Sequence, residues 1–187
     1  MRIIGGRWRG LTLADVGAGD PKTHLRPTSD RVREAIFNLL INGGYGDPVT
    51  DARVLDLFAG TGALGLEALS RGAASLTLVD NGPVARGLIA RNIALCKESR
   101  AVHLARDATR LPPQSGDGFS LIFLDPPYGK GLGELALTSA LTGGWLAPEA
   151  LVVWEETATA LLVPAGFDQI DQRRYGDTRV TLLRRAG

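Results

Sequence analysis

Two short segments of the chain combine residue types and spacing that could do chemistry. In the first, Gly60, Gly62 and Gly65 follow the apolar run 54–58 and open a stretch of good helix formers. In the second, an acidic residue and two prolines precede a tyrosine at 125–128, directly after the apolar run 121–124. A glycine turn between a strand and a helix lets a ligand approach the backbone closely. The acidic loop would face the same ligand, because open α/β sheets bind ligands at the carboxyl ends of their strands.

The glycine segment predicts a ligand that contains a nucleoside. The next apolar run, 76–79, ends in Asp80, twenty residues after Gly60. A carboxylate at the end of the second strand can accept hydrogen bonds from both hydroxyls of a ribose. The alternative for Asp80 is a solvated residue at a strand end.

Asp56 bears on which nucleoside cofactor is bound. It lies inside the strand just before the glycine turn, where a negative charge would repel the pyrophosphate of a nicotinamide dinucleotide. The same charge would suit the ammonium and sulfonium groups of S-adenosylmethionine, so the sequence favours that cofactor. The alternative is a buried carboxylate that caps the following helix, although buried acids are rare unless they are paired.

The segment Asp125-Pro126-Pro127-Tyr128 is suited to holding an amino group of a nucleobase. Each proline fixes φ near about −65° and removes a backbone donor, so the carbonyl groups form a rigid row of acceptors. Acceptors at Asp125 and the Pro126 carbonyl could bind an exocyclic amine and align its lone pair with a methyl donor. Tyr128 would stack on the base, which must be unpaired or flipped out to enter such a pocket. The alternative is a turn without chemistry, since the pair at 112–113 shows that Pro-Pro also occurs elsewhere.

The elements that must position these residues follow from hydrophobic periodicity and turn residues. A helix is predicted over 28–40, capped by Thr28 or Ser29, with its apolar residues on one face and Arg33 directed elsewhere. Beyond residue 50, strands and helices alternate as in a parallel sheet covered by helices, and the chain ends in an antiparallel pair. The other predicted helices are 63–69, 83–96 and 132–141, and the predicted strands are 54–58, 76–79, 101–104, 121–124, 151–155, 167–175 and 179–183.

The composition predicts one cytoplasmic α/β domain. With 187 residues and 44% hydrophobic content, the chain can bury one core. It has no apolar run long enough to span a bilayer and no signal-peptide pattern, so we expect a soluble protein of the cytoplasm. The single cysteine, Cys96, excludes an internal disulfide, and His24 and His103 lack the spacing of metal ligands, so we expect no metal.

Basic charge is concentrated at the two ends of the chain. The whole chain has a net charge of +1, but residues 1–33 hold seven Lys and Arg against three acids, and residues 173–187 hold five against one. Each end therefore carries +4, and the rest carries −7. Arg2, Arg7 and Arg9 surround Trp8, a pattern suited to phosphate contacts beside a stacking surface. The alternative is a solvated edge strand.

Taken together, these motifs resemble the bacterial 16S rRNA guanine-N2 methyltransferase family, and the resemblance extends from one end of the chain to the other. It is carried by the segments 2–10, 25–38, 58–71, 125–128 and 174–178. It implies an α/β fold of the Rossmann-like class I methyltransferase type. Such a fold has a mostly parallel seven-stranded sheet, helices on both faces, a C-terminal antiparallel hairpin and, here, a small N-terminal extension. The implied parts are an RNA-contacting basic arm or hairpin with a helix at 1–50 and an S-adenosylmethionine-dependent methyltransferase core at 51–187.

The resemblance implies a monomeric enzyme that transfers a methyl group from S-adenosylmethionine to the N2 amine of a guanine in 16S rRNA. The partner would be rRNA in the small ribosomal subunit or an assembly intermediate, with no membrane involved. The residues implied to hold the cofactor are Asp56, Phe58, Gly60, Thr61, Gly62, Ala63, Leu64, Asp80, Asn81, Asp107, Ala108 and Asp125. The residues implied to hold the base and carry catalysis are Asp125, Pro126, Pro127 and Tyr128. The residues expected to contact RNA are Arg2, Arg7, Trp8, Arg9, Arg26, Thr28, Arg31 and Arg33.

Three other functions share parts of this pattern. A DNA adenine or cytosine amino-methyltransferase would use the same chemistry, but only about 50 residues precede the core and no target-recognition domain of that size follows it. A protein glutamine methyltransferase is disfavoured by Asp125, because an amide would better offer a donor and an acceptor to a carboxamide. A non-catalytic RNA-binding assembly factor would keep the fold without methyl transfer.

Overall fold

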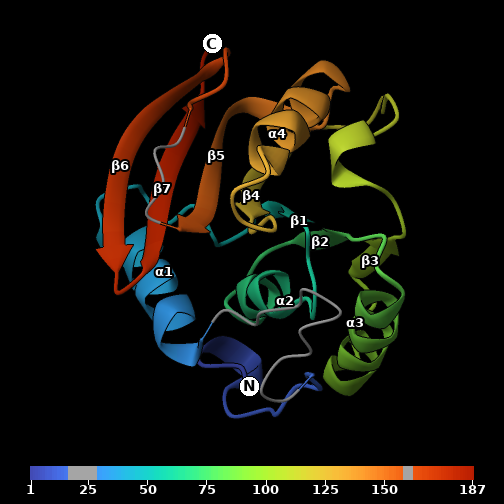
Figure 1. The fold of residues 1–187 in the computed structure, drawn as a ribbon. Coiled ribbons are helices and arrows are strands. Elements are labelled where there is room, and N and C mark those ends of the chain that lie inside the picture. The colour runs from blue at the N-terminus through green and yellow to red at the C-terminus, as the bar shows by residue number, and fades with distance from the viewer. Residues whose placement is uncertain (17–28, 158–161) are drawn as a thin grey trace.

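The computed structural model describes residues 1–16, 29–157 and 162–187. Seven strands form one sheet in the order β3-β2-β1-β4-β5-β7-β6 (Figure 1). The strands are β1 (Arg53–Leu57), β2 (Ser75–Val79), β3 (Ala101–Leu104), β4 (Phe119–Leu124), β5 (Leu146–Thr157), β6 (Phe167–Tyr175) and β7 (Thr178–Arg185). In the described part of the chain, no helix is long and apolar enough to cross a membrane.

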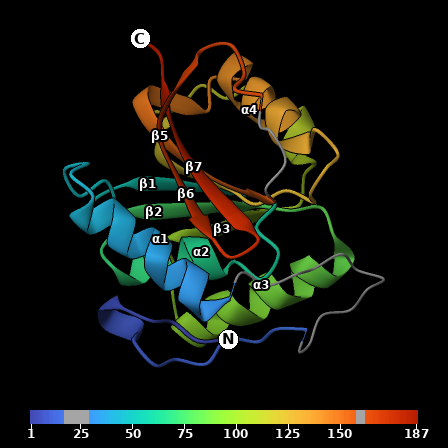
Figure 2. The same ribbon diagram turned by 60° about the vertical axis from the view of Figure 1, so that its left-hand side comes forward.

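Helices cover both faces of the sheet, as predicted. Figure 2 shows α1, α2 and α3 on one side of the strands and α4 on the other. The helices are α1 (Asp30–Asn42), α2 (Ala63–Ser70), α3 (Pro83–Cys96) and α4 (Leu132–Thr142), with short 3-10 turns at η1 (Gly6–Trp8) and η2 (Ala108–Arg110).

The five strands from β3 to β5 are parallel, whereas β7 pairs antiparallel with both β5 and β6. Strand order reverses between β1 and β4, because the chain first adds β2 and β3 on one side of β1 and then places β4 on the other. At such a switch point, helices leave in opposite directions and open a crevice at the carboxyl ends of the strands. The predicted sheet with its C-terminal antiparallel hairpin is therefore confirmed.

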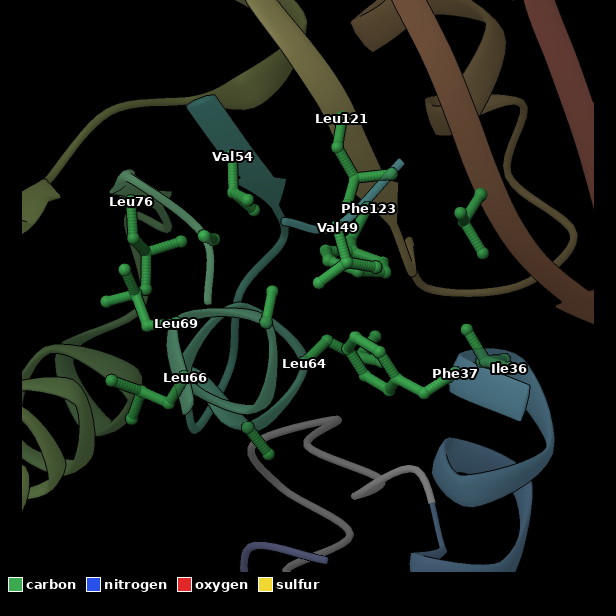
Figure 3. Packing of buried hydrophobic residues seen from close by; sticks show 14 of the residues in the cluster. Ile36, Phe37, Val49, Val54, Leu64, Leu66, Leu69, Leu76, Leu121 and Phe123 are labelled. Carbon is green, nitrogen blue, oxygen red and sulfur yellow. The ribbon is translucent and has the colours of Figure 1, made fainter. Parts of the chain in front are cut away.

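The core between the sheet and the first three helices packs apolar side chains from each layer. Figure 3 shows Phe37 of α1 and Leu64 of α2 directed towards the strand residue Phe123. The ring centroids of Phe37 and Phe123 lie 5.6 Å apart, which is a favourable distance for a tilted aromatic pair. This packing holds α2, and thus the glycine turn before it, against the switch point.

Most predicted boundaries lie within two residues of those in the structure, and the starts of α1 and β5 show physical reasons for a difference. Helix α1 begins at Asp30 because the Ser29 hydroxyl accepts a hydrogen bond from the Val32 N–H at 3.2 Å and so acts as its N-cap. The other predicted cap, Thr28, lies outside the described residues. Strand β5 begins at Leu146, earlier than predicted, because residues 147–150 bulge opposite Ser120 and do not end the strand.

The N-terminal arm, which we define as residues 1–16, packs beside α2 and α3 on the side away from the sheet (Figure 2). Its two limbs meet in an antiparallel bridge between Arg2 and Thr12, and Ile3 and Leu13 are buried. A Cβ atom on Gly6 would lie 1.9 Å from the Ser70 carbonyl oxygen at the end of α2. Glycine at this position therefore allows the arm to lie directly against the helix.

Candidate functional site

The carboxyl edge of the sheet brings together the acidic residues that the sequence placed at strand ends. In the register of β1, Leu57 lies beside Val79 of β2 and beside Leu124 of β4. Asp80 and Asp125, the next residues of the neighbouring strands, therefore lie on either side of the turn that follows β1. The Asp125 N–H donates to the Leu57 carbonyl at 3.4 Å and fixes the start of its loop.

The turn after β1 needs left-handed backbone at three positions. Phe58, Gly60 and Gly62 have φ angles of 59°, 56° and 77°. This conformation is open to glycine and uncommon for a bulky residue such as Phe58, so the turn is a constrained one. Gly65, one turn into α2, serves another purpose, because a Cβ there would lie 2.5 Å from Leu76 Cδ1 of β2. The spacing therefore combines a tight turn with close packing of helix on strand.

Asp80 is held at this turn by backbone donors. Its Oδ2 accepts from the Gly60 N–H at 2.9 Å, and its Oδ1 accepts from the Gly82 N–H at 2.8 Å. The residue is partly exposed, and each carboxylate oxygen can accept more than one hydrogen bond. The carboxylate is therefore oriented beside the glycine turn with capacity for ligand hydroxyls, and Asn81 next to it is exposed.

Asp56 has a different environment from the one that the sequence argument assumed. It is buried, and its Oδ2 accepts from the Gly65 N–H in the first turn of α2 at 2.9 Å. Burial raises the pKa of Asp56 to about 8 and the Asp80 charge adds to this, while the Gly65 hydrogen bond acts in the opposite direction. The prediction of a fixed negative charge is thus corrected. The alternative of a helix cap is what the structure shows, and near neutral pH the carboxyl is mostly protonated.

The remaining predicted cofactor residues lie along the same edge. Asp107 follows β3, and its Oδ1 accepts from both the Thr109 N–H at 2.9 Å and the Thr109 hydroxyl at 2.7 Å. Ala108 is buried, and so are Thr61, just before α2, and Ala63 and Leu64, the first two residues of α2. The structure therefore brings the turn and the ends of β2, β3 and β4 to one edge.

The loop 125–128 leaves β4 at the centre of this edge. Asp125, Pro127 and Tyr128 are partly exposed, and Pro126 is buried. The Tyr128 hydroxyl donates to Glu155 Oε1 at 3.3 Å. Sequence reasoning missed Glu155, although an acid at the end of the apolar run 151–154 is the same signal that identified Asp80 and Asp125.

Among the residues expected to contact RNA, the arginines of the N-terminal arm differ from one another. Arg2 and Arg9 are exposed. Arg7 pairs with Glu98 and its guanidinium lies 4.1 Å from the centre of the Trp8 ring. Hydrogen bonds from Arg100, with a smaller contribution from Arg7, hold the pKa of Glu98 down at about 2, so this acid is charged at any ordinary pH. Arg7 thus has a protein partner already.

Arg33 corrects another expectation. Its side chain is fully buried, contrary to its predicted place on the polar face of α1. It donates to the Arg2 carbonyl and to Asp30 Oδ1, and its Nε lies 3.7 Å from Glu67 Oε2. Residue 33 shares a face with Ile36, Phe37 and Leu40 at helical spacing, and nearby acids compensate its charge. The guanidinium is therefore not on the surface where a phosphate could reach it.

Glu67 is the centre of this buried network. Its carboxylate accepts from the N–H groups of Ile4 and Gly5, at 2.8 Å each, and from Arg71 Nε at 2.8 Å. The network fastens the arm to α2 and α1. Of the other predicted RNA contacts on this side, Arg31 is exposed on α1, while Arg26 and Thr28 lie outside the described residues.

The hairpin of β6 and β7 turns at the same edge as the acidic loop. Thr157, beyond the end of β4, pairs with Thr178, which also pairs with Tyr175 across the turn. Arg174 and Arg179 flank this turn and face each other in the register. Of the basic C-terminal end predicted from the sequence, Arg174 and Arg179 therefore lie at the same edge as the loop 125–128, whereas Arg184 and Arg185 lie at the opposite end of the sheet.

Comparisons with known proteins agree on one family. The family model described as conserved hypothetical protein 95 matches residues 1–184. Ribosomal RNA small subunit methyltransferase D of Escherichia coli strain K12 is 38% identical over 187 residues, covering 99% of this chain and 90% of that protein. The protein of the same name from Haemophilus influenzae is 32% identical over 181 residues, covering 94% and 89%. The solved structure of yhhF from Escherichia coli, a proposed methyltransferase, covers 100% of this chain and 98% of its own at 36% identity, with a TM-score of 0.82.

Proposed function

Because the chain belongs to the conserved hypothetical protein 95 family and is 38% identical to a relative named as a small-subunit ribosomal RNA methyltransferase, we propose that it methylates 16S rRNA at the carboxyl edge of its sheet. The observation that carries the proposal is the meeting of Asp80, the glycine turn and the loop 125–128 at the switch point between β1 and β4. The first two can hold a nucleoside cofactor, and the third can hold an amino group beside it.

We propose S-adenosylmethionine as the cofactor, held by the residues that the sequence predicted for cofactor binding. When bound, it would supply a methyl group on a positively charged sulfur. The chain's own donor set fits such a molecule, because Asp80 is oriented for ribose hydroxyls and the left-handed turn allows close approach to the backbone. Asp56 could also contribute, since a cation placed nearby would favour its charged form.

We propose the N2 amine of a guanine as the methyl acceptor. Guanine presents two adjacent donors on its Watson–Crick edge, N1–H and the N2 amine, and an ionised Asp125 could accept from both. The Pro126 carbonyl would accept the other hydrogen of the amine, and Pro127 would keep this part of the loop rigid. Adenine has an acceptor at N1, which the carboxylate would repel. Tyr128 would stack on the base, so the target must be unpaired or flipped out.

Two basic surfaces are proposed to hold the rRNA, and only the C-terminal one lies at the carboxyl edge, because the arm turn with Arg9 lies at the far end of α2, where the Trp8 N–H donates to the Ser70 hydroxyl. One consists of the exposed arginines of the N-terminal part, residues 1–50, with Arg9 and Arg31 as its members best placed to meet phosphates. The other is the turn of the C-terminal hairpin with Arg174 and Arg179. Nucleic-acid phosphates bind such surfaces with a strong dependence on salt. The protein would act as a monomer on the small ribosomal subunit or an assembly intermediate.

The test is to map the methyl group. Small subunits from cells that lack the protein would be incubated with the purified protein and S-adenosylmethionine, then analysed by primer extension and mass spectrometry. We expect a new methyl group on the N2 atom of one guanine in 16S rRNA. Transfer to an adenine, to DNA or to a protein glutamine would reject the substrate. Calorimetric binding of NAD but not of S-adenosylmethionine would reject the cofactor, and cofactor binding without any transfer would indicate an assembly factor.

A further inference from the structure

Glu155 is a buried acid beside the loop that is proposed to hold the base. The register of β4 and β5 pairs Leu124 with Trp154, so Glu155 lies next to Asp125 at the carboxyl edge. On its other side it pairs with Val180 of β7. Only 4% of Glu155 is exposed, and strands on both sides fix its backbone.

The hydrogen bond from the Tyr128 hydroxyl to Glu155 Oε1, 3.3 Å long, connects the loop to this rigid strand. Tyr128 itself is followed by Gly129, which is exposed and has a φ of 70°, so the chain beyond the ring has little packing to fix it. The tyrosine side chain turns about two torsions. The bond at the distal end of the phenol restricts both torsions.

We propose that Glu155 is a positioning residue that holds the Tyr128 ring in the orientation needed to stack on the target base. This inference rests on the proposed function, since it gives Glu155 a part in substrate placement at the same site. Glu155 acts through Tyr128 and touches neither the cofactor nor the reacting atoms. Ordering the ring before the base arrives lowers the cost of binding in the productive geometry.

The proposal is tested by a double-mutant cycle between Tyr128→Phe and Glu155→Ala, with methyl transfer to small subunits as the assay. Tyr128→Phe keeps the ring and removes only the donor, so it is the variant that best preserves the fold. We expect each single variant to lower kcat by about tenfold, the size expected for the loss of one hydrogen bond. The double variant should be no worse than the poorer single variant, because both changes break the same contact.

A conservative variant and a matched control separate positioning from general damage. Glu155→Gln keeps an acceptor for the Tyr128 hydroxyl and should recover kcat to within about threefold of the unaltered protein. Glu149→Gln makes the same chemical change at the other end of β5, where the side chain is exposed, and should leave kcat unchanged. Binding of S-adenosylmethionine should be equal in all variants.

Two outcomes would overturn the proposal while leaving the proposed function in place. One is full activity of Tyr128→Phe. The other is multiplication of the two single effects in the double variant, which would mean that Glu155 acts independently of Tyr128. If the unaltered protein itself transfers no methyl group to small subunits, the proposed function fails instead, and the cycle has no activity to compare.

Discussion

The carboxyl edge of the sheet and the N-terminal arm use charged side chains in opposite ways. At the edge, Asp80 is bound by backbone N–H groups and stays partly exposed, so it remains able to accept further hydrogen bonds. In the arm and the helices beneath it, Glu67 and Arg33 are fully buried and interact with each other and with the backbone. A charged residue in a motif can therefore build the site or build the fold, and its burial separates the two.

The same contrast exists within the edge, between Asp56 and Asp80. Both carboxylates accept a hydrogen bond from a backbone N–H of the glycine segment, at 2.9 Å in each case. Asp56 is buried, and burial raises its pKa to about 8, whereas Asp80 is partly exposed. The position relative to the strand therefore decides the role of the carboxyl group. Asp56, inside β1, caps α2 and carries a proton, whereas Asp80, directly after β2, is an acceptor on the ligand side.

The largest expected effect is on the stability of the arm network, when its central charge is removed. Glu67→Gln would leave Arg33 and Arg71 without their buried counter-charge, and we expect a loss of about 3–5 kcal/mol in the free energy of unfolding, measured by urea titration. Glu34→Gln, on the exposed face of α1, should change it by less than about 0.5 kcal/mol. If Glu67→Gln is as stable as the unaltered protein, the network does not hold the arm.

The corresponding change at the edge should affect chemistry and leave the fold intact. Asp125→Asn keeps the shape of the side chain and removes one acceptor, so methyl transfer to guanine should fall by about 100-fold, with cofactor affinity unchanged. Asp117→Asn makes the same change at a side chain that is 96% exposed and should be fully active. Full activity of Asp125→Asn would remove Asp125 from the proposed catalytic role.

The pH dependence of stability sharpens the comparison of Asp56 with Asp80. Because the folded state raises the pKa of Asp56 from 3.8 to about 8, the folded protein binds more protons than the unfolded chain between these values. The stability contributed by Asp56 is therefore complete below about pH 4 and is lost as pH rises towards 8, by at most about 1.4 kcal/mol per pH unit.

The measurement is urea unfolding between pH 5 and 9, comparing the unaltered protein with Asp56→Asn, which cannot titrate. The stability of the unaltered protein should fall relative to that of Asp56→Asn as pH rises, and the difference should become constant above about pH 8. Asp117→Asn, which makes the same change at a side chain that is 96% exposed, serves as the control. A difference for Asp56→Asn that does not vary with pH would mean that Asp56 is already charged in the folded protein.

The smallest expected effect distinguishes two arginines of the arm. The logarithm of the RNA-binding constant falls with the logarithm of the salt concentration, and Arg9→Ala should reduce the steepness of this fall by roughly 0.7 to 0.9, the value for one lost phosphate contact. Arg7→Ala should lower it by less, because Arg7 is already paired with Glu98. Binding of 16S rRNA fragments at several salt concentrations measures both. Equal slopes for Arg9→Ala and the unaltered protein would contradict an RNA contact at Arg9.

Local sequence signals predicted much of the fold and of the edge. Helix α3 begins at Pro83 and ends at Cys96 as predicted, since proline suits the first helical position and the glycine before it ends the preceding turn. Asp80 and Asp125 could be placed together because parallel strands bring their carboxyl ends to one edge. Both predictions needed only the pattern of a few neighbouring residues.

The features that were missed depend on partners far away in sequence. The burial of Arg33 depends on Glu67, and the bond from Tyr128 depends on Glu155, which is 27 residues later. The pKa of Asp56 depends on how tightly α2 packs over its strand. A single sequence gives the spacing of such residues but not the side on which their neighbours will lie, so an arginine that belongs to the core was predicted to be on the surface.

The attachment of the arm also has a consequence for the order of folding. The acceptors of the Ile4 and Gly5 N–H groups are 63 and 62 residues further along the chain, and Ala14 bonds to Asn92 at a separation of 78. A ribosome synthesises the arm well before it synthesises these partners. Contacts across such separations carry a large loop-closure cost and form late. We therefore expect the arm to stay accessible to proteases and chaperones during synthesis until α3 has emerged, and to close over the helices afterwards.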